Sequence, residues 1–155
     1  MPFRIHALDQ SGFAPYFAMT EAELARNHIR RLRVDAHPGF PCRITLEDAP
    51  MGSSVLLISI THLDGDSPYR SSGPVFVREN APVAKIAPGE IPSMLRSRQL
   101  SLRAYDTAHM MIDATVTSGE TLRSHLEKLF QNPATDYVHI HHASRGCYAC
   151  AATRT

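Results

Sequence analysis

The sequence predicts an α+β fold: a mainly antiparallel sheet of about eight short strands with two helices packed on one side. Residues 38–92 hold eight of the eleven prolines and five of the eight glycines, which excludes long helices there. Short runs rich in β-branched residues lie between these breaks. Most predicted strands follow one another through short turns without a crossover helix, which favours antiparallel pairing.

Nine segments have the composition or the alternation of strands. They are residues 3–8, 29–35, 42–46, 55–62, 75–78, 100–105, 110–116, 137–143 and 147–152. The run from Val55 to Ile60 has apolar residues at both odd-numbered and even-numbered positions, so we expect a central strand that is covered on both faces.

Two segments carry helix start signals. Thr20 followed by Glu23 fits a capping box, which predicts a helix over residues 21–28. Thr117 with Glu120 fits the same box and precedes an apolar stripe at helical spacing. The stripe consists of Leu122, Leu126, Leu129 and Phe130.

Length and composition limit the classes of protein that this chain can be. A chain of 155 residues with 43% hydrophobic residues fits a single domain over residues 1–155. A net charge of +1 removes the usual argument for a nucleic acid or an anionic membrane as partner. The longest apolar run is far shorter than a membrane span, and the first residues lack a secretory signal, so we expect a cytoplasmic protein.

Standard cofactor motifs are missing from the sequence. It contains no P-loop, no G-x-G-x-x-G, no H-E-x-x-H and no G-x-S-x-G, so we expect no nucleotide cofactor. No metal is expected either, because no second ligand cluster has the spacing of a zinc finger or ribbon. Three cysteines are an odd number, which favours free thiols.

The C-terminal strand pair concentrates reactive side chains. Residues 137–143 alternate like a half-buried strand, which places His139 and His141 on one face. Residues two apart on a strand lie about 6.6 Å apart and point the same way, so both imidazoles can reach one ligand or one metal ion. A three-residue hairpin loop over 144–146 then leads to Cys147, with the glycine in the left-handed conformation.

The length of this loop decides which cysteine joins the histidines. With three loop residues, Ala143 pairs with Cys147 and His141 pairs with Ala149, so Cys147 shares the histidine face and Cys150 does not. A two-residue loop would reverse the faces of the two cysteines. We prefer the longer loop, because Arg-Gly is not a favoured two-residue turn. In the alternative interpretation these residues have no function: the histidines form a solvent-exposed face, and the cysteines belong to the core.

Four further side chains are candidates for holding an anion. Arg70 and Tyr69 lie in a turn-rich segment, Arg103 in a predicted strand, and Arg145 in the hairpin loop. Guanidinium groups hold carboxylates or phosphates with two hydrogen bonds, so convergence of these side chains would form an anion pocket. Pairing of the arginines with nearby acidic residues is the competing interpretation.

Several segments together resemble a known family. They are Phe40 to Arg43 with Leu46 to Asp48, Pro68 to Arg70 with Ser72 to Arg78, Leu102 to Asp106, and His139 to Tyr148. In order and spacing they resemble a bacterial family catalogued as a domain of unknown function, numbered twelve hundred and three. The resemblance covers essentially the whole chain. It implies a single bacterial domain and supplies no catalytic residues, and it favours Cys147 over a dithiol with Cys150.

Three classes of function follow from these observations. The leading hypothesis is a pocket for a small anionic molecule, lined by Arg70, Arg103, Tyr69 and the face with His139, His141 and Cys147. The second is an enzyme in which Cys147 is the nucleophile, His139 or His141 keeps it as a thiolate and Arg145 stabilises negative charge, or a metal-dependent variant of it. The third is a protein-interaction or homo-oligomerisation module without catalysis.

Overall fold

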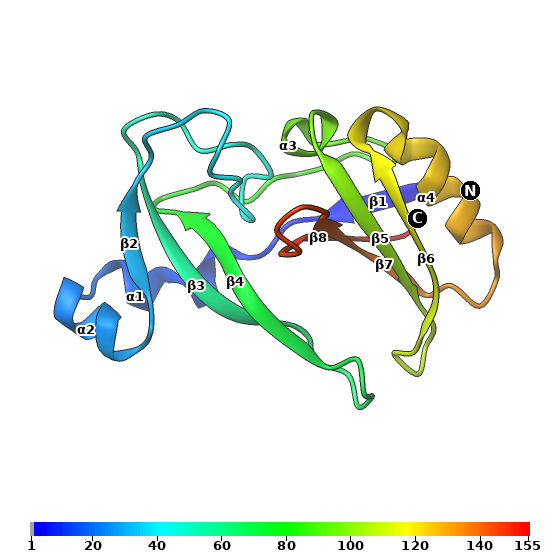
Figure 1. Ribbon diagram of the computed structural model, residues 1–155, viewed down its shortest axis with the longest axis horizontal. Helices are drawn as coiled ribbons and strands as arrows, with labels where there is room; N and C mark the ends of the chain where they lie inside the picture. Colours follow the sequence, from blue (N-terminus) through cyan, green and yellow to red (C-terminus); the bar gives the residue numbers. More distant parts are fainter. Residues whose placement is uncertain (1) are drawn as a thin grey trace.

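The computed structural model describes residues 2–155 as two antiparallel sheets that lie side by side (Figure 1). The five-stranded sheet has the order β1 (Phe3–His6), β8 (Tyr148–Arg154), β7 (Tyr137–His142), β5 (Gln99–Tyr105) and β6 (Met111–Ser118). The three-stranded sheet has the order β2 (Arg30–Arg33), β3 (Ser54–Leu63) and β4 (Ser71–Arg78). The predicted α+β class with antiparallel pairing is confirmed, although the strands form two sheets rather than one.

The described residues form four short helices. They are α1 (Ala14–Phe17), α2 (Glu21–Arg26), α3 (Ser93–Arg96) and α4 (Leu122–Gln131), with 3-10 turns η1 (Gln10–Gly12) and η2 (Gly119–Thr121). Because α2 and α4 pack on different sheets, the predicted packing of two helices on one side of one sheet is not confirmed. In Figure 1, α4 lies beside the five-stranded sheet, whereas α1 and α2 lie at the three-stranded sheet. Within residues 2–155, no helix is long and apolar enough to cross a membrane.

The two predicted helix starts have different outcomes. The hydroxyl of Thr20 accepts a hydrogen bond from the backbone N–H of Glu23 at 3.2 Å, as the capping box predicts. The predicted cap at Thr117 is wrong, because β6 continues to Ser118 and the helix begins only at Leu122. Ser118 instead caps the intervening 3-10 turn. The Thr117 hydroxyl contacts side chains instead, Thr121 Oγ1 at 2.7 Å and His125 Nδ1 at 3.1 Å.

The predicted strand over residues 42–46 is also wrong. This segment belongs to the connection between β2 and β3, where Pro41 bridges to Asp48 and Cys42 bridges to Phe76 as isolated contacts. Proline cannot donate a ladder hydrogen bond, which limits pairing at this point. The expected central position of the strand at residues 55–62 is confirmed, because β3 lies between β2 and β4, but the expected cover on both faces is wrong, because Leu57 is half-buried and Ser59 is exposed.

Each sheet buries one apolar face. The apolar stripe of α4 packs on the five-stranded sheet, where Leu102, Val138 and Ile140 belong to the same core. A second core joins the three-stranded sheet to α2 through Leu24 and to the connection through Ile44. Because side chains alternate along a strand, the five-stranded sheet presents its polar residues on the face opposite to α4.

Two polar contacts join the sheets near their ends. At the hairpin tips, Ser67 donates a hydrogen bond to the carbonyl of His109 at 2.8 Å, and the Tyr69 ring lies edge-on to Tyr105. Near the other end, the carboxylate of Asp48 accepts two hydrogen bonds from Arg98, at 2.8 and 2.6 Å. This bidentate pair ties the connection between β2 and β3 to the start of β5.

We predict that Asp48→Asn lowers the free energy of unfolding by about 2–3 kcal/mol near pH 7, because Arg98 then loses a partly buried charged acceptor. Burial raises the pKa of Asp48, but the hydrogen bonds and the charge of Arg98 outweigh it and hold the pKa below its ordinary value. The pair therefore stabilises the protein above the unfolded pKa of about 3.9 and loses this effect as the pH falls through the lower folded value. Urea unfolding between neutral and acidic pH measures the difference.

The control for this prediction is Asp64→Asn. Asp64 forms an exposed ion pair with Arg70 at 2.9 Å, so its loss should change the unfolding free energy by less than about 0.5 kcal/mol. Equal effects of the two substitutions would contradict the role assigned to Asp48.

Candidate functional site

The β7–β8 hairpin has a four-residue loop rather than the predicted three. The backbone N–H of His142 donates to the carbonyl of Cys147 at 2.9 Å, and that of Gly146 donates to the carbonyl of His142 at 2.8 Å. His141 therefore lies opposite Tyr148, and the predicted pairs of Ala143 with Cys147 and of His141 with Ala149 are wrong. The left-handed conformation expected for Gly146 is confirmed, since its φ is 81°.

This register separates the predicted side chains. A shift of one residue reverses the face of every side chain on the partner strand. Tyr148, not Cys147, shares the face of His139 and His141, and its ring lies 5.1 and 5.8 Å from theirs. Cys147 instead lines a pocket together with His142.

Cys150 lies away from the histidine face, as expected. A bulge in the β7–β8 pairing places Cys150 opposite Ile140, in the core beneath α4. Burial raises the pKa of the Cys150 thiol to about 12, so this sulfur stays protonated.

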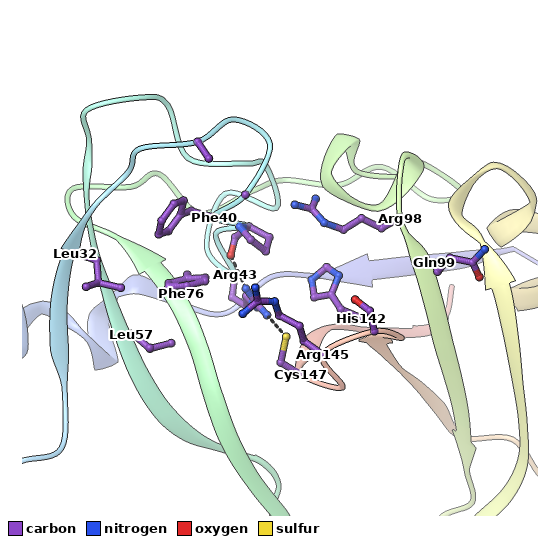
Figure 2. Close-up of a pocket in the computed structure, with 14 residues that line it drawn as sticks. Leu32, Phe40, Arg43, Leu57, Phe76, Arg98, Gln99, His142, Arg145 and Cys147 are labelled. Carbon is purple, nitrogen blue, oxygen red and sulfur yellow. Dashed lines mark hydrogen bonds between the residues drawn. The ribbon is translucent and has the colours of Figure 1, made fainter.

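The pocket lies between the two sheets and has about 680 Å³ of free volume (Figure 2). One wall is apolar and comes from the three-stranded sheet and its connection, with Leu32, Phe40, Leu57 and Phe76. The other wall is basic, with Arg98, His142 and Arg145, and Arg43 lies between the two walls. None of the described residues that line the pocket is acidic. The pocket is therefore suited to a molecule that has both an apolar and an anionic part.

Arg43 forms the floor between the walls, and its side chain is only 1% exposed. Its Nε donates to the carbonyl of Tyr148 at 2.8 Å, Nη1 donates to the carbonyl of Pro41, and Nη2 lies 3.1 Å from Cys147 Sγ. No carboxylate of residues 2–155 forms an ion pair with it. Burial lowers the pKa of Arg43, but a guanidinium remains charged at neutral pH. The pocket floor is thus positively charged.

His142 and Arg145 have free polar groups at the basic wall. The His142 side chain is 6% exposed, and neither ring nitrogen has a hydrogen-bond partner among the described residues. Burial, with the nearby charges of Arg43 and Arg98, lowers the pKa of His142 to about 3, so the ring is neutral. Arg145 is exposed and forms no ion pair within the described chain. Arg98 is not free in this way, because its guanidinium forms two hydrogen bonds with the carboxylate of Asp48.

His139 and His141 belong to a second cluster, which a third histidine completes. His62 at the end of β3 brings its ring to 5.2 Å from that of His141 and 6.1 Å from that of His139, measured between centroids. We name His62, His139 and His141 the histidine triad. Burial lowers the pKa of all three rings, to about 3 for His139 and about 4 for His141.

No companion for His62 could be predicted from the sequence, because its contacts with His139 and His141 join two sheets. The sequence places His62 at the end of the predicted strand 55–62, but no local pattern indicates which faces of two sheets pack together. Two of the remaining predicted residues lie near the triad: Arg103 is beside His139 in the β5–β7 pair, and Tyr69 lies against Tyr105, whose ring contacts His139. Arg70 is exposed and paired with Asp64. The predicted single site is therefore divided between the pocket and the histidine triad.

Comparison with known proteins gives one match. The model of a family described as "Protein of unknown function (DUF1203)" matches residues 39–154, which include both the pocket hairpin and the histidine triad. No curated protein and no solved structure matches the chain.

We predict that Arg43→Lys destabilises the protein by about 2–3 kcal/mol, measured by urea unfolding. A single ammonium group cannot reach three acceptors that lie around a planar fork, so buried carbonyls lose their donors. Arg26→Lys, at an exposed position at the end of α2, is the control and should change stability by less than about 0.5 kcal/mol. A stability change for Arg43→Lys no larger than this control would argue against Arg43 as a structural link.

Proposed function

This chain belongs to the DUF1203 family, and we propose that it binds a small anionic molecule in the pocket between its two sheets. The observation that carries the proposal is the basic lining of the pocket, which combines the buried Arg43 at the floor, without an acidic partner, with the unpaired groups of His142 and Arg145. Uncompensated positive charge beside a low-dielectric wall attracts anions. An anionic ligand would supply the missing counter-charge.

The two walls indicate the form of the ligand. Its anionic group would lie at Arg145, whose guanidinium is free to form two hydrogen bonds with a phosphate or carboxylate. Its apolar body would contact Phe40 and Phe76, whose rings lie 5.0 Å apart on the opposite wall. The pocket volume lies within the range of about 300–1,000 Å³ that is typical of small-molecule sites.

Phenyl phosphate is a suitable probe, because it has both parts. We predict that it binds with a measurable heat in calorimetry and raises the melting temperature, and that inorganic phosphate does so more weakly because it lacks the apolar body. Arg145→Gln should weaken phenyl phosphate binding by about tenfold or more, the usual effect of losing a charge-assisted bidentate contact.

Arg70→Gln is the matched control, since Arg70 is an exposed arginine of the hairpin tip, outside the pocket. It should leave binding of phenyl phosphate unchanged. No binding at about 10 mM phenyl phosphate, or equal binding by the Arg145→Gln protein, would refute the proposed pocket.

A contact in the pocket favours thiol chemistry as a second candidate function. The guanidinium of Arg43 lies 3.1 Å from Cys147 Sγ, and a cation at this distance stabilises negative charge on sulfur. In this proposal Cys147 is the nucleophile and Arg145 stabilises charge on the attacked group. Arg43 takes the place that the sequence assigned to His139 or His141, because its guanidinium touches Cys147 and those two histidines do not line the pocket.

We predict that iodoacetamide alkylates Cys147 at least about tenfold faster than Cys42 or Cys150 in the folded protein. The sulfur displaces iodide and forms a thioether; Cys147 is half-buried, whereas the other two thiols are fully buried. Mass spectrometry of peptides after timed labelling measures the three rates. Cys147→Ser should abolish the fast phase, and uniformly slow labelling of all three cysteines would rule out a reactive Cys147.

A further inference from the structure

The histidine triad lies between the sheets, and its residues do not line the pocket of the proposed function. We propose that His62, His139 and His141 bind one divalent transition-metal ion of the zinc class. His62 comes from β3 of the three-stranded sheet, whereas His139 and His141 come from β7 of the five-stranded sheet. A bound ion would therefore join the two sheets.

The spacing of the rings fits one ion. Each histidine offers a ring nitrogen, and these three atoms lie within 4.8 Å of one another. Some point lies within about 2.8 Å of all three atoms, so ring movements on the order of 0.7 Å give the zinc–nitrogen bond length of roughly 2.05 Å. Small changes in side-chain torsion angles supply such a movement.

The burial of the triad leaves ring nitrogens without partners. His139 and His141 are 6% and 2% exposed. Among residues 2–155, six buried side-chain atoms lack a hydrogen-bond partner, and three of them belong to this cluster: His62 Nδ1, His139 Nδ1 and His141 Nε2. An unpaired buried polar atom costs stability, and such atoms are uncommon in folded proteins. Coordination of an ion would give imidazole nitrogens of this cluster a partner.

A backbone contact orients one of the ligands. His141 Nδ1 lies 2.9 Å from the carbonyl of Gly146, and a carbonyl can only accept, so Nδ1 carries the proton. The lone pair of His141 is then on Nε2, which is the unpartnered atom. Metal-binding histidines commonly donate their other N–H to a carbonyl in this way, which fixes the tautomer and the ring orientation.

Aromatic rings hold the triad in place. Tyr148 stacks on His62 with centroids 5.2 Å apart and planes at 7°. The rings of Tyr105 and Tyr137 lie 5.4 and 5.0 Å from that of His139, measured between centroids. Ligands that are held before the ion arrives lose little conformational freedom on binding.

The donor set selects the class of ion. Three imidazoles suit zinc, copper or nickel, whereas calcium and magnesium require oxygen ligands. Three protein ligands also leave a fourth position open, which is the arrangement of catalytic zinc sites. Arg103 lies beside His139 and repels a cation, so an anion in the fourth position would offset its charge.

Titration of the EDTA-treated full-length protein with zinc chloride tests the inference. Calorimetry should show one ion per chain, and cobalt(II) should give the intense visible absorption of a four-coordinate site. His62→Gln should weaken zinc binding by about 100-fold or more, because it removes one of three ligands. His62 is only half-buried, so this variant should remain folded, which circular dichroism verifies.

His6→Gln is the matched control, because His6 is exposed and its ring forms a hydrogen bond with Thr153, outside the triad. It should bind zinc as the original protein does. No zinc binding at about 1 mM, or undiminished binding by both His62→Gln and His141→Gln, would overturn the inference.

The inference is independent of the proposed anion pocket, and the same variants distinguish their failures. Arg145→Gln should retain zinc binding while it loses phenyl phosphate. His62→Gln should lose zinc while it retains phenyl phosphate in the presence of EDTA.

Discussion

The buried guanidinium of Arg43 is the contact on which the arrangement of the two sheets depends. Its backbone belongs to the three-stranded side, where its N–H donates to the carbonyl of Phe76. Its side chain donates to the carbonyl of Tyr148 in the five-stranded sheet. A buried charge is tolerated only when its hydrogen bonds are satisfied, so these acceptors fix the position of the β7–β8 hairpin relative to the connection that carries Arg43. Both candidate sites lie beside this hairpin.

The polarity of the space between the sheets follows from how each sheet is covered. The α4 helix buries the outer face of the five-stranded sheet, which requires apolar side chains at alternate positions such as Val138 and Ile140. The intervening positions, including His139 and His141, then face the other sheet. From the five-stranded sheet, imidazoles, phenol rings and guanidinium groups point into this space, and several of their polar atoms lack partners among residues 2–155. Unpaired polar atoms of this kind make the space suitable for ligands rather than for core packing.

The hairpin register divides these polar residues into two sites. Because the loop has four residues, Tyr148 joins the histidine triad, and Cys147 joins Arg43 and His142 in the pocket. A loop of three residues would have placed the thiol with the histidines. With one loop residue fewer, the thiol and the imidazoles would form one site. In the observed register the histidine triad lies on one face of the hairpin, and the basic pocket with the thiol of Cys147 lies on the other. The two sites therefore suit different ligands: the neutral imidazoles of the histidine triad suit a metal cation, and the positively charged pocket suits an anion.

Local sequence patterns determined the antiparallel α+β class, most of the strands, the cap at Thr20 and the side-by-side placement of His139 and His141. These features depend on side-chain alternation and on backbone hydrogen bonds within a few residues. The tertiary structure alone decided that there are two sheets, that His62 completes the triad and that residues 42–46 form a connection that contributes Arg43 to the pocket. It also decided the hairpin register, which the bonds around Arg43 and the bulge at β8 set together. Contacts between residues that are distant in sequence depend on which surfaces pack, and no periodicity within a strand encodes that choice.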